Sequence, residues 1–188
     1  MFDTTDTIVL YEELAVEDVL PLHWDGHAPH PAAAAALAER NLHVLQAWDA
    51  LEDHGLVEKP DETAPLAADI QRLDRKMTLL LGLVGQLLAV NRPRPQPVPL
   101  QFNARGALWR AAEMPPAVGA RGHLEIYLHE CVAQPLRLPA EVTSVSSAGE
   151  VKARFAPLDD ALSGILAKIA FRRHRRQIAG RHGPKRHD

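Results

Sequence analysis

Residues 98–110, VPLQFNARGALWR, alternate apolar and polar side chains up to a polar interruption that ends in a glycine. Every second residue from Val98 to Phe102 is apolar, which is typical of a β-strand with one buried face. The segment 103–106 (NARG) then stands where the strand would be expected to continue. Glycine turns a corner at lower conformational cost than other residues, so Gly106 fits either a turn or a short binding loop.

Three later segments show the same period of two. Their apolar positions are Leu124, Ile126 and Leu128, then Leu136, Leu138, Ala140 and Val142, then Val151, Ala153 and Phe155. Short strands with turn-forming residues between them predict a small antiparallel β-barrel. Near the amino terminus, residues 7–14 (TIVLYEEL) are rich in β-branched and aromatic side chains, and they predict an additional early strand.

Two helical patterns lie between the early strand and residue 98. The first covers residues 32–54, where an alanine run leads into spaced leucines and Gly55 follows as a helix-ending residue. The second has an unbroken heptad stripe formed by Leu66, Ile70, Leu73, Met77, Leu80, Val84 and Leu87. The prolines of residues 91–97 end this helix. A strict heptad over a helix of roughly 33 Å indicates a supercoiled partner more than packing on a small barrel.

The positions that flank the stripe change character along the helix. In the first half they hold Asp69, Asp74 and Lys76, and in the second half Leu81, Leu83, Leu88 and Val90. Ile, Met and Val at a with Leu at d favour two strands, whereas apolar flanks favour a bundle of more helices. Each exposed Leu or Val would leave roughly 1.5–3 kcal/mol of burial unused. We therefore predict a homo-oligomer larger than a dimer, expected to be a tetramer, although the first helix could also cover part of the stripe.

The carboxy-terminal part predicts an amphipathic helix and a basic tail. The apolar face of the helix is formed by Leu158, Leu162, Ile165, Leu166 and Ile169, and Gly180 is expected to close it. From Lys168 onward there are eight basic residues and one acid, whereas residues 1–30 have seven acids and no Lys or Arg. Such asymmetry can indicate a nucleic-acid or an acidic-membrane partner. Because the basic run lacks interleaved aromatics beyond Phe171, we favour mutual neutralisation of two neighbouring ends and expect no nucleic acid.

Composition and motifs narrow the class of protein. Cys131 is the only cysteine, which excludes an intrachain disulfide and a cysteine-based zinc cluster. The sequence predicts neither a signal peptide nor an apolar span of about 18 residues, and we expect a cytoplasmic protein. His23, Asp25, His27 and His30 are too loosely spaced to predict a metal site. Without a phosphate-binding glycine loop, a nucleophile elbow or a zinc-protease motif, we expect no enzyme and no cofactor.

The stretch 98–110, followed by 123–145 and 150–177, resembles the PilZ domain family. In that family a strand leads to a short loop ending in glycine, and a later strand pair and a basic terminal helix complete the barrel. The resemblance covers residues 98–180, and the amino-terminal strand more loosely. The long helices are similar to those of the atypical tetrameric PilZ subfamily, whose helical insertions assemble the subunits. The resemblance implies an α+β fold, with a small antiparallel barrel, a terminal helix and a long helical, coiled-coil insertion.

PilZ domains that bind cyclic di-GMP have an Arg-x-x-x-Arg motif before the first strand. Paired guanidinium groups suit this ligand because they bind guanine edges and phosphates bidentately. If the first strand is 7–14, no arginine precedes it, because the first arginine is Arg40. Arg92 and Arg94 are two residues apart and lie in the proline-rich linker. The sequence therefore lacks an arginine pair with the spacing and position that the PilZ motif requires.

The second PilZ motif is Asp/Asn-x-Ser-x-x-Gly in the loop. Gly106 matches the glycine, Gln101 stands at the first place and Asn103 at the serine place. We predict that this loop is a retained turn and that cyclic di-GMP is not bound in the usual PilZ manner. Arg105 and Arg110 are the remaining candidates for a different mode of binding.

These patterns predict three regions. Residues 1–30 form the amino-terminal strand region of the barrel, 31–91 a helical oligomerisation insertion, and 92–188 the rest of the barrel, the terminal helix and the basic tail. We expect a non-catalytic regulatory scaffold in bacterial cyclic di-GMP-related signalling, with a protein partner. The first alternative is an atypical cyclic di-GMP receptor, and the second is a nucleic-acid-binding protein that uses its basic carboxy-terminal segment.

Overall fold

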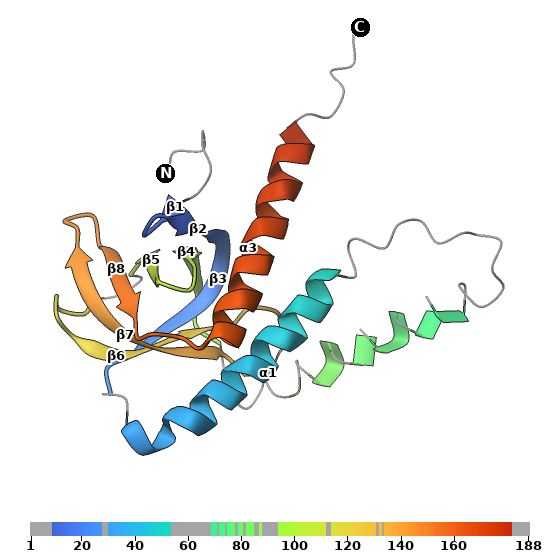
Figure 1. The fold of residues 1–188 in the computed structure, drawn as a ribbon, viewed down its shortest axis with the longest axis horizontal. Helices are drawn as coiled ribbons and strands as arrows, with labels where there is room; N and C mark the ends of the chain where they lie inside the picture. The colour runs from blue at the N-terminus through green and yellow to red at the C-terminus, as the bar shows by residue number, and fades with distance from the viewer. Residues whose placement is uncertain are drawn as a thin grey trace, which may run out of the picture.

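The chain folds around a closed antiparallel barrel of six strands (Figure 1). The computed structural model describes residues 9–27, 30–53, 69–70, 72–73, 75–77, 79–80, 82–84, 87, 94–111, 114–130, 132 and 134–181. The barrel strands are β3 (Val16–Asp25), β4 (Pro97–Phe102), β5 (Gly106–Arg110), β6 (Arg121–Ile126), β7 (Leu136–Val145) and β8 (Glu150–Phe155). Their spatial order is β3, β4, β5, β8, β7, β6, and β6 pairs with β3 to close the barrel. The predicted barrel is confirmed.

The barrel interior contains the residues that the period of two indicated. The buried side chains include Leu100, Phe102, Leu124, Ile126, Leu136, Leu138, Ala140, Val142, Val151, Ala153 and Phe155. Each large side chain of this set contributes about 1.5–3 kcal/mol by leaving water. Leu128, predicted as the last inward position of its strand, is buried but lies just beyond the end of β6.

Two helices complete the core. Helix α1 (Ala34–Asp53), preceded by the short 3-10 turn η1 (Pro31–Ala33), buries Trp48, which stacks on Phe102 with ring centroids 6.1 Å apart. Helix α3 (Asp160–Arg181) buries Leu162, Leu166 and Ile169 of the predicted apolar face, and it lies beside α1 in Figure 1. Ile165 is only partly buried, and Leu158 lies before the helix begins. Gly180 lies inside α3, so the prediction that it closes the helix was wrong.

The amino-terminal strand prediction was wrong in its boundaries. Instead of one strand over residues 7–14, β1 (Val9–Leu10) and β2 (Glu13–Leu14) form an antiparallel hairpin, and residues 7 and 8 lie outside the described part of the chain. The turn consists of Tyr11 and Glu12, which have positive φ angles of 50° and 66°. Side chains disfavour this backbone region, and neither tyrosine nor glutamate is a typical turn residue, so no turn was predicted there.

The first barrel strand is β3, which the sequence pattern missed. Its first half pairs with β4 up to Pro21, and its second half pairs with β6 from Leu22 onward. Proline cannot donate to a strand ladder, and here it lies where the strand changes partners. Val16, Leu20, Leu22 and Trp24 face the core along the whole strand. The pattern was missed because Asp18 interrupts the apolar positions and Pro21 disfavours a strand assignment.

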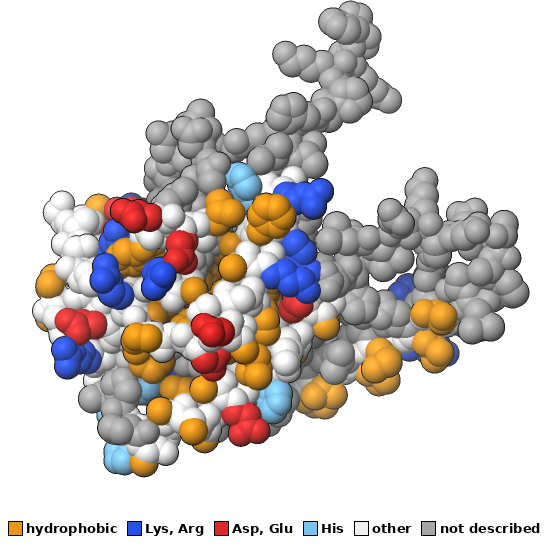
Figure 2. Space-filling model, in the orientation of Figure 1, with side chains coloured by type: hydrophobic (Ala, Val, Ile, Leu, Met, Phe, Trp, Pro, Cys, Tyr) orange, Lys and Arg blue, Asp and Glu red, His pale blue; other side chains and the backbone are white. Residues whose placement is uncertain are grey.

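The heptad segment, residues 66–87, begins at Leu66, which lies outside the described residues. All its described residues are helical. Six apolar side chains of the stripe are largely exposed: Ile70 58%, Leu73 61%, Met77 62%, Leu80 58%, Val84 51% and Leu87 69%. Figure 2 shows a row of apolar side chains on this part of the surface. No helix among the described residues is long and apolar enough to span a membrane.

Candidate functional site

Asn103 organises the turn between β4 and β5. Its Oδ1 accepts hydrogen bonds from the backbone N–H groups of Arg105, at 2.8 Å, and Gly106, at 3.2 Å. Its Nδ2 donates to the carbonyl oxygens of Leu10 and Glu13 in the β1–β2 hairpin. The residue is only 3% exposed, so both ends of its amide are engaged inside the protein. Asn103 holds the turn closed and fastens the hairpin to it.

Gly106 is required by close packing. A Cβ at this position would lie 2.2 Å from the carbonyl oxygen of Ala153 and 2.4 Å from the ring of Tyr11. Its φ is not positive, whereas Gly119 and Gly149 have positive φ. The sequence therefore indicated an important glycine correctly, but the reason is the close approach of β8 and Tyr11 and not a turn conformation.

Two of the other predicted ligand residues, Gln101 and Arg105, form side-chain contacts within the protein. Gln101 donates from Nε2 to Oε1 of Glu17 at 3.2 Å, and Arg105 Nε lies 2.8 Å from Glu13 Oε1. Arg110 is exposed and stands opposite Glu150 on β8. The structure thus brings Gln101, Asn103, Arg105 and Gly106 together around the turn and places Arg110 at the other end of β5.

Tyr11 makes the main aromatic contact of the hairpin with the barrel wall. The ring centroid is 4.4 Å from Lys152 Nζ and 5.1 Å from the Arg154 guanidinium carbon. The phenol oxygen lies 3.3 Å from Thr143 Oγ1. At exposed sites each cation–π contact contributes about 0.5–1 kcal/mol. Sequence analysis missed these residues, although Lys152 and Arg154 alternate with buried residues and therefore share the outer face of β8.

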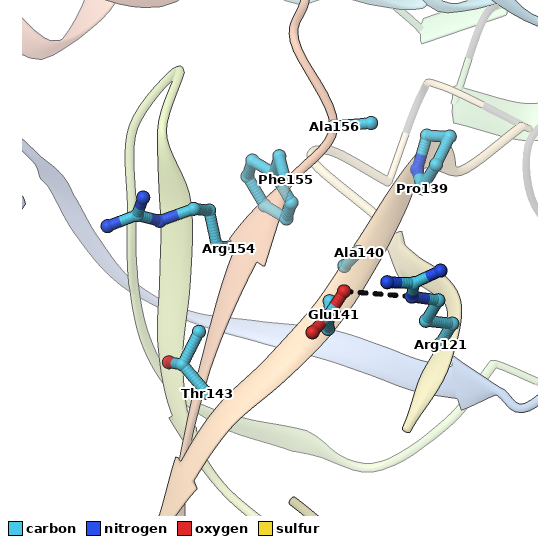
Figure 3. Close-up of a pocket in the computed structure, with 8 residues that line it drawn as sticks. All are labelled: Arg121, Pro139, Ala140, Glu141, Thr143, Arg154, Phe155 and Ala156. Carbon is cyan, nitrogen blue, oxygen red and sulfur yellow. Dashed lines mark hydrogen bonds and ion pairs between the residues drawn. The ribbon is translucent and has the colours of Figure 1, made fainter. Parts of the chain in front are cut away.

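A pocket of about 510 Å³ is formed by residues of β6, β7 and β8 (Figure 3). It is lined by Arg121, Pro139, Ala140, Glu141, Thr143, Arg154, Phe155 and Ala156. Arg121 Nε is held by Glu141 Oε2 at 2.8 Å on one side of the pocket, and Arg154 stands on the opposite side. Thr143 and Arg154 also contact Tyr11, so the pocket and the hairpin meet along one strand pair.

The arginine pair of the usual PilZ site has no counterpart before the barrel. The first barrel strand begins at Val16, and the first arginine of the chain is Arg40. In the linker, Arg94 Nη2 donates to the carbonyl oxygens of Glu130 and Val132 at 3.0 and 3.2 Å. Arg92 lies outside the described residues. Arg94 therefore fixes the loop after β6.

Part of the basic helix α3 is neutralised within the chain. Lys168 and Arg172 form ion pairs with Asp49 of α1, and Arg173 Nη1 lies 2.5 Å from Asp18 Oδ2 of β3. The Asp18 contact confirms, for this pair, the predicted neutralisation between the acidic amino-terminal region and the basic carboxy-terminal region. These three cations pair with carboxylates of the same chain, which weakens the nucleic-acid alternative.

Arg137 on β7 gathers a cluster of charged groups. Its guanidinium lies 2.5 Å from Asp25 Oδ2, 3.3 Å from Glu125 Oε1 and 3.4 Å from His123 Nδ1. A hydrogen bond from His27 is the main cause that lowers the pKa of Asp25 to about 2, and Arg137 lowers it further. Burial, followed by the charge of Arg137, lowers the pKa of His123. Within the described residues, no group of three or more His, Cys, Asp or Glu is arranged to hold a metal ion.

Comparison with known proteins agrees with this architecture. Residues 45–182 match the family described as "Atypical PilZ domain, cyclic di-GMP receptor". The chain is also similar to a solved tetrameric PilZ domain protein from Xanthomonas campestris, which self-assembles through a helical bundle. The two share 29% sequence identity over 90% of this chain and 93% of that chain, with a TM-score of 0.67. No curated protein matches. The family match, over most of the chain and with the closed six-stranded barrel beneath it, shows that this protein belongs to the atypical PilZ domain family.

Proposed function

We propose that this protein is a non-catalytic PilZ scaffold that assembles with itself through the heptad segment and presents its barrels to a protein partner in bacterial signalling. In this proposal, residues 1–30 and 92–188 supply the barrel and residues 31–91 the helical insertion. The exposed stripe of the heptad segment is the observation that carries the proposal. Ile70, Leu73, Met77 and Leu80 are each more than half exposed in a single chain.

A second copy of the segment is the occupant that suits this stripe best. The a and d positions repeat without interruption, so identical helices can pack with their seams in register. Helix α1 is a poor alternative, because Val44, Leu45 and Trp48 on its apolar face are already buried in the barrel core. The similar Xanthomonas protein is a tetramer built by a helical bundle, which supports the same arrangement here.

The flanks of the stripe favour more than two helices. Leu83, at a g position, is 49% exposed, and Leu79, at a c position, is 65% exposed. A two-helix seam covers a and d but leaves such flanks in water, whereas four helices bury a wider face. In the first half of the segment, Asp69 and Arg72 form an ion pair, as expected for the solvated side of a bundle. We therefore propose a homotetramer.

Replacing both Leu73 and Leu80 with Asp tests the proposal. Burial of unpaired carboxylates in the seam costs several kcal/mol per subunit, so the assembly should dissociate. Multi-angle light scattering should then give a mass near 20.7 kDa, whereas the wild type should give about four times that value. Circular dichroism should retain the strand signal. Arg72→Glu, at a c position outside the seam, is the matched control. A wild type that is monomeric in solution would refute the assembly.

A second candidate function, an atypical cyclic di-GMP receptor, is favoured by the family description and by the pocket between Arg121 and Arg154. Against it, Asn103, Gly106 and Arg105 are engaged with the hairpin in the same chain. Isothermal titration of the wild type with cyclic di-GMP separates the two. We expect no binding in the low-micromolar range, and tight binding that is lost in Arg105→Ala or Arg110→Ala would establish the receptor.

A further inference from the structure

We propose that the β1–β2 hairpin is an intramolecular cap on a nucleotide-binding surface of the outer barrel wall. The surface is formed by Arg105, Lys152 and Arg154 together with the adjoining pocket, and cyclic di-GMP binds there when the hairpin is displaced. The proposal rests on the proposed absence of tight binding in the closed protein. It explains that absence by the closed hairpin, and it implies that displacing the hairpin restores binding.

The hairpin offers the wall the kinds of group that a nucleotide offers. Tyr11 presents an aromatic ring to Lys152 and Arg154, and Glu13 presents a carboxylate to Arg105. Guanine rings and phosphates attract arginine and lysine through the same stacking and charge interactions. The chain's own amino-terminal residues therefore satisfy three cations that would otherwise be available to a ligand.

The position of the hairpin also blocks the wall sterically. The ring of Tyr11 lies so close to Gly106 that not even a Cβ would fit between them. Thr143 and Arg154 contact Tyr11 and also line the pocket of about 510 Å³. Removal of the ring would join the flat backbone at Gly106 to this pocket. The combined surface would have Arg121 and Arg154 on opposite sides and would be lined also by the apolar side chains of Pro139 and Phe155.

The hairpin is built to detach without opening the barrel. Its two strands form a sheet of their own, so its displacement breaks no ladder of the closed barrel. The turn residues Tyr11 and Glu12 both have positive φ, a conformation that non-glycine residues adopt only when other contacts compensate. The ion pair between Glu13 and Arg105 is largely exposed and therefore weak.

Other contacts keep the cap closed in the free protein. Leu10 is 5% exposed, and Asn103 donates to both Leu10 and Glu13. A ligand that binds only the open form is weakened in proportion to the fraction of open molecules. Variants that change this fraction must therefore change the apparent affinity in a direction that the structure fixes.

Titration calorimetry with cyclic di-GMP on three full-length variants tests the cap. Tyr11→Ala removes the ring and should bind about tenfold or more tightly than the wild type. Tyr11→Phe keeps the ring and loses only the hydroxyl, so its affinity should stay close to that of the wild type. Glu12→Gly relieves the positive φ, stabilises the cap and should bind no more tightly than the wild type. In the Tyr11→Ala background, Arg154→Ala should abolish the gain.

Equal affinities for Tyr11→Ala and Tyr11→Phe would overturn the cap, as would a gain that survives Arg154→Ala. Hydrogen exchange on the wild type gives a test that needs no variant. Excess cyclic di-GMP should accelerate exchange in residues 10–14, and unchanged exchange there would also overturn the cap. Tight wild-type binding equal to that of Tyr11→Ala would refute both the cap and the proposed absence of binding. Absence of binding in all proteins would refute the cap alone and leave the scaffold proposal intact.

Discussion

The hairpin on the barrel wall and the heptad segment differ in where their side chains find partners. Around the hairpin, Asn103, Arg105 and Tyr11 all contact residues of the same chain. Along the heptad segment, Leu73 and Met77 are each more than 60% exposed. The region that resembles a ligand site is thus filled from within, whereas the region that resembles a protein core is exposed in the described part of the chain.

This difference shows that an apparent binding motif and an apparent core pattern must both be checked against the contacts that their side chains make in the folded chain. A glycine-ended loop indicates binding only if its polar groups are free, and here the amide of Asn103 is fully engaged. An aliphatic stripe indicates a core only if the chain covers it, and here the described part of the chain leaves Leu80 and Val84 more than half exposed. In our proposals, the first region binds a ligand only after the hairpin opens, and the second is covered by another subunit.

The largest expected effect is a difference in stability between two alanine substitutions, one in the barrel core and one in the heptad seam. Trp48→Ala removes a fully buried ring that stacks on Phe102, and it should lower the free energy of unfolding by about 3–5 kcal/mol. Leu80→Ala removes a side chain that is 58% exposed, so in dilute, dissociated protein the barrel should lose less than about 1 kcal/mol.

Urea unfolding followed by far-ultraviolet circular dichroism measures both variants. At higher concentration, Leu80→Ala should weaken assembly in light scattering, whereas Trp48→Ala should reduce stability at every concentration. A large loss of barrel stability in dilute Leu80→Ala would mean that the heptad segment packs on its own barrel, and the contrast between the two regions would fail.

A second, smaller effect concerns the glycine under the hairpin. Gly106→Ala would place a Cβ 2.2 Å from the Ala153 carbonyl oxygen, and this overpacking should cost about 1–3 kcal/mol. Gly164→Ala in α3 is the matched control, since a Cβ there meets nothing within 4 Å. The control should gain about 0.5–1 kcal/mol from helix propensity. Thermal unfolding of both variants measures the difference, and a neutral Gly106→Ala would show that the hairpin and β8 yield easily.

The sequence predicted the parts of the fold that have one buried face and one solvated face. β4, β6, β7 and β8 alternate because one side of each strand faces the barrel core. β3 was missed because Asp18 and Pro21 interrupt its apolar pattern, and the hairpin was merged into one strand because Tyr11 and Glu12 carry no turn signal. A local sequence pattern does not indicate such features, because the contacts that stabilise them come from residues far away in the chain.

The candidate site was predicted only in part for the same reason. Asn103 and Gly106 were identified as important, and the structure places both at the turn. The contacts of Tyr11 with Lys152 and Arg154 join the amino terminus to β8, and no spacing rule links positions so distant. The pocket beside them is likewise made by residues of three strands.

The smallest expected effect is a loss of folding stability at acid pH that arises where β6 and β7 meet. His123 is 6% exposed, and burial together with the charge of Arg137 lowers its pKa in the folded protein below the ordinary value of 6.5. The groups that face it are Arg137, Asp25, Glu125 and the backbone of His27. Neutral His123 therefore fits the folded state, and protonation favours unfolding.

A group with a lowered pKa contributes stability that is complete above its unfolded pKa and declines as the pH falls toward the folded value. For His123 the loss begins near 6.5, whereas for Asp25 it begins only below 3.8 and ends near 2. His123→Gln, which keeps a hydrogen-bonding side chain, should therefore lose less stability than the wild type between pH 7.5 and 5.5. The substitution removes the part of the pH dependence that is due to His123, which can be no more than about 1.4 kcal/mol of unfolding free energy per pH unit. Urea midpoints at the two pH values measure this, and equal losses in both proteins would show that His123 is already accommodated as a cation.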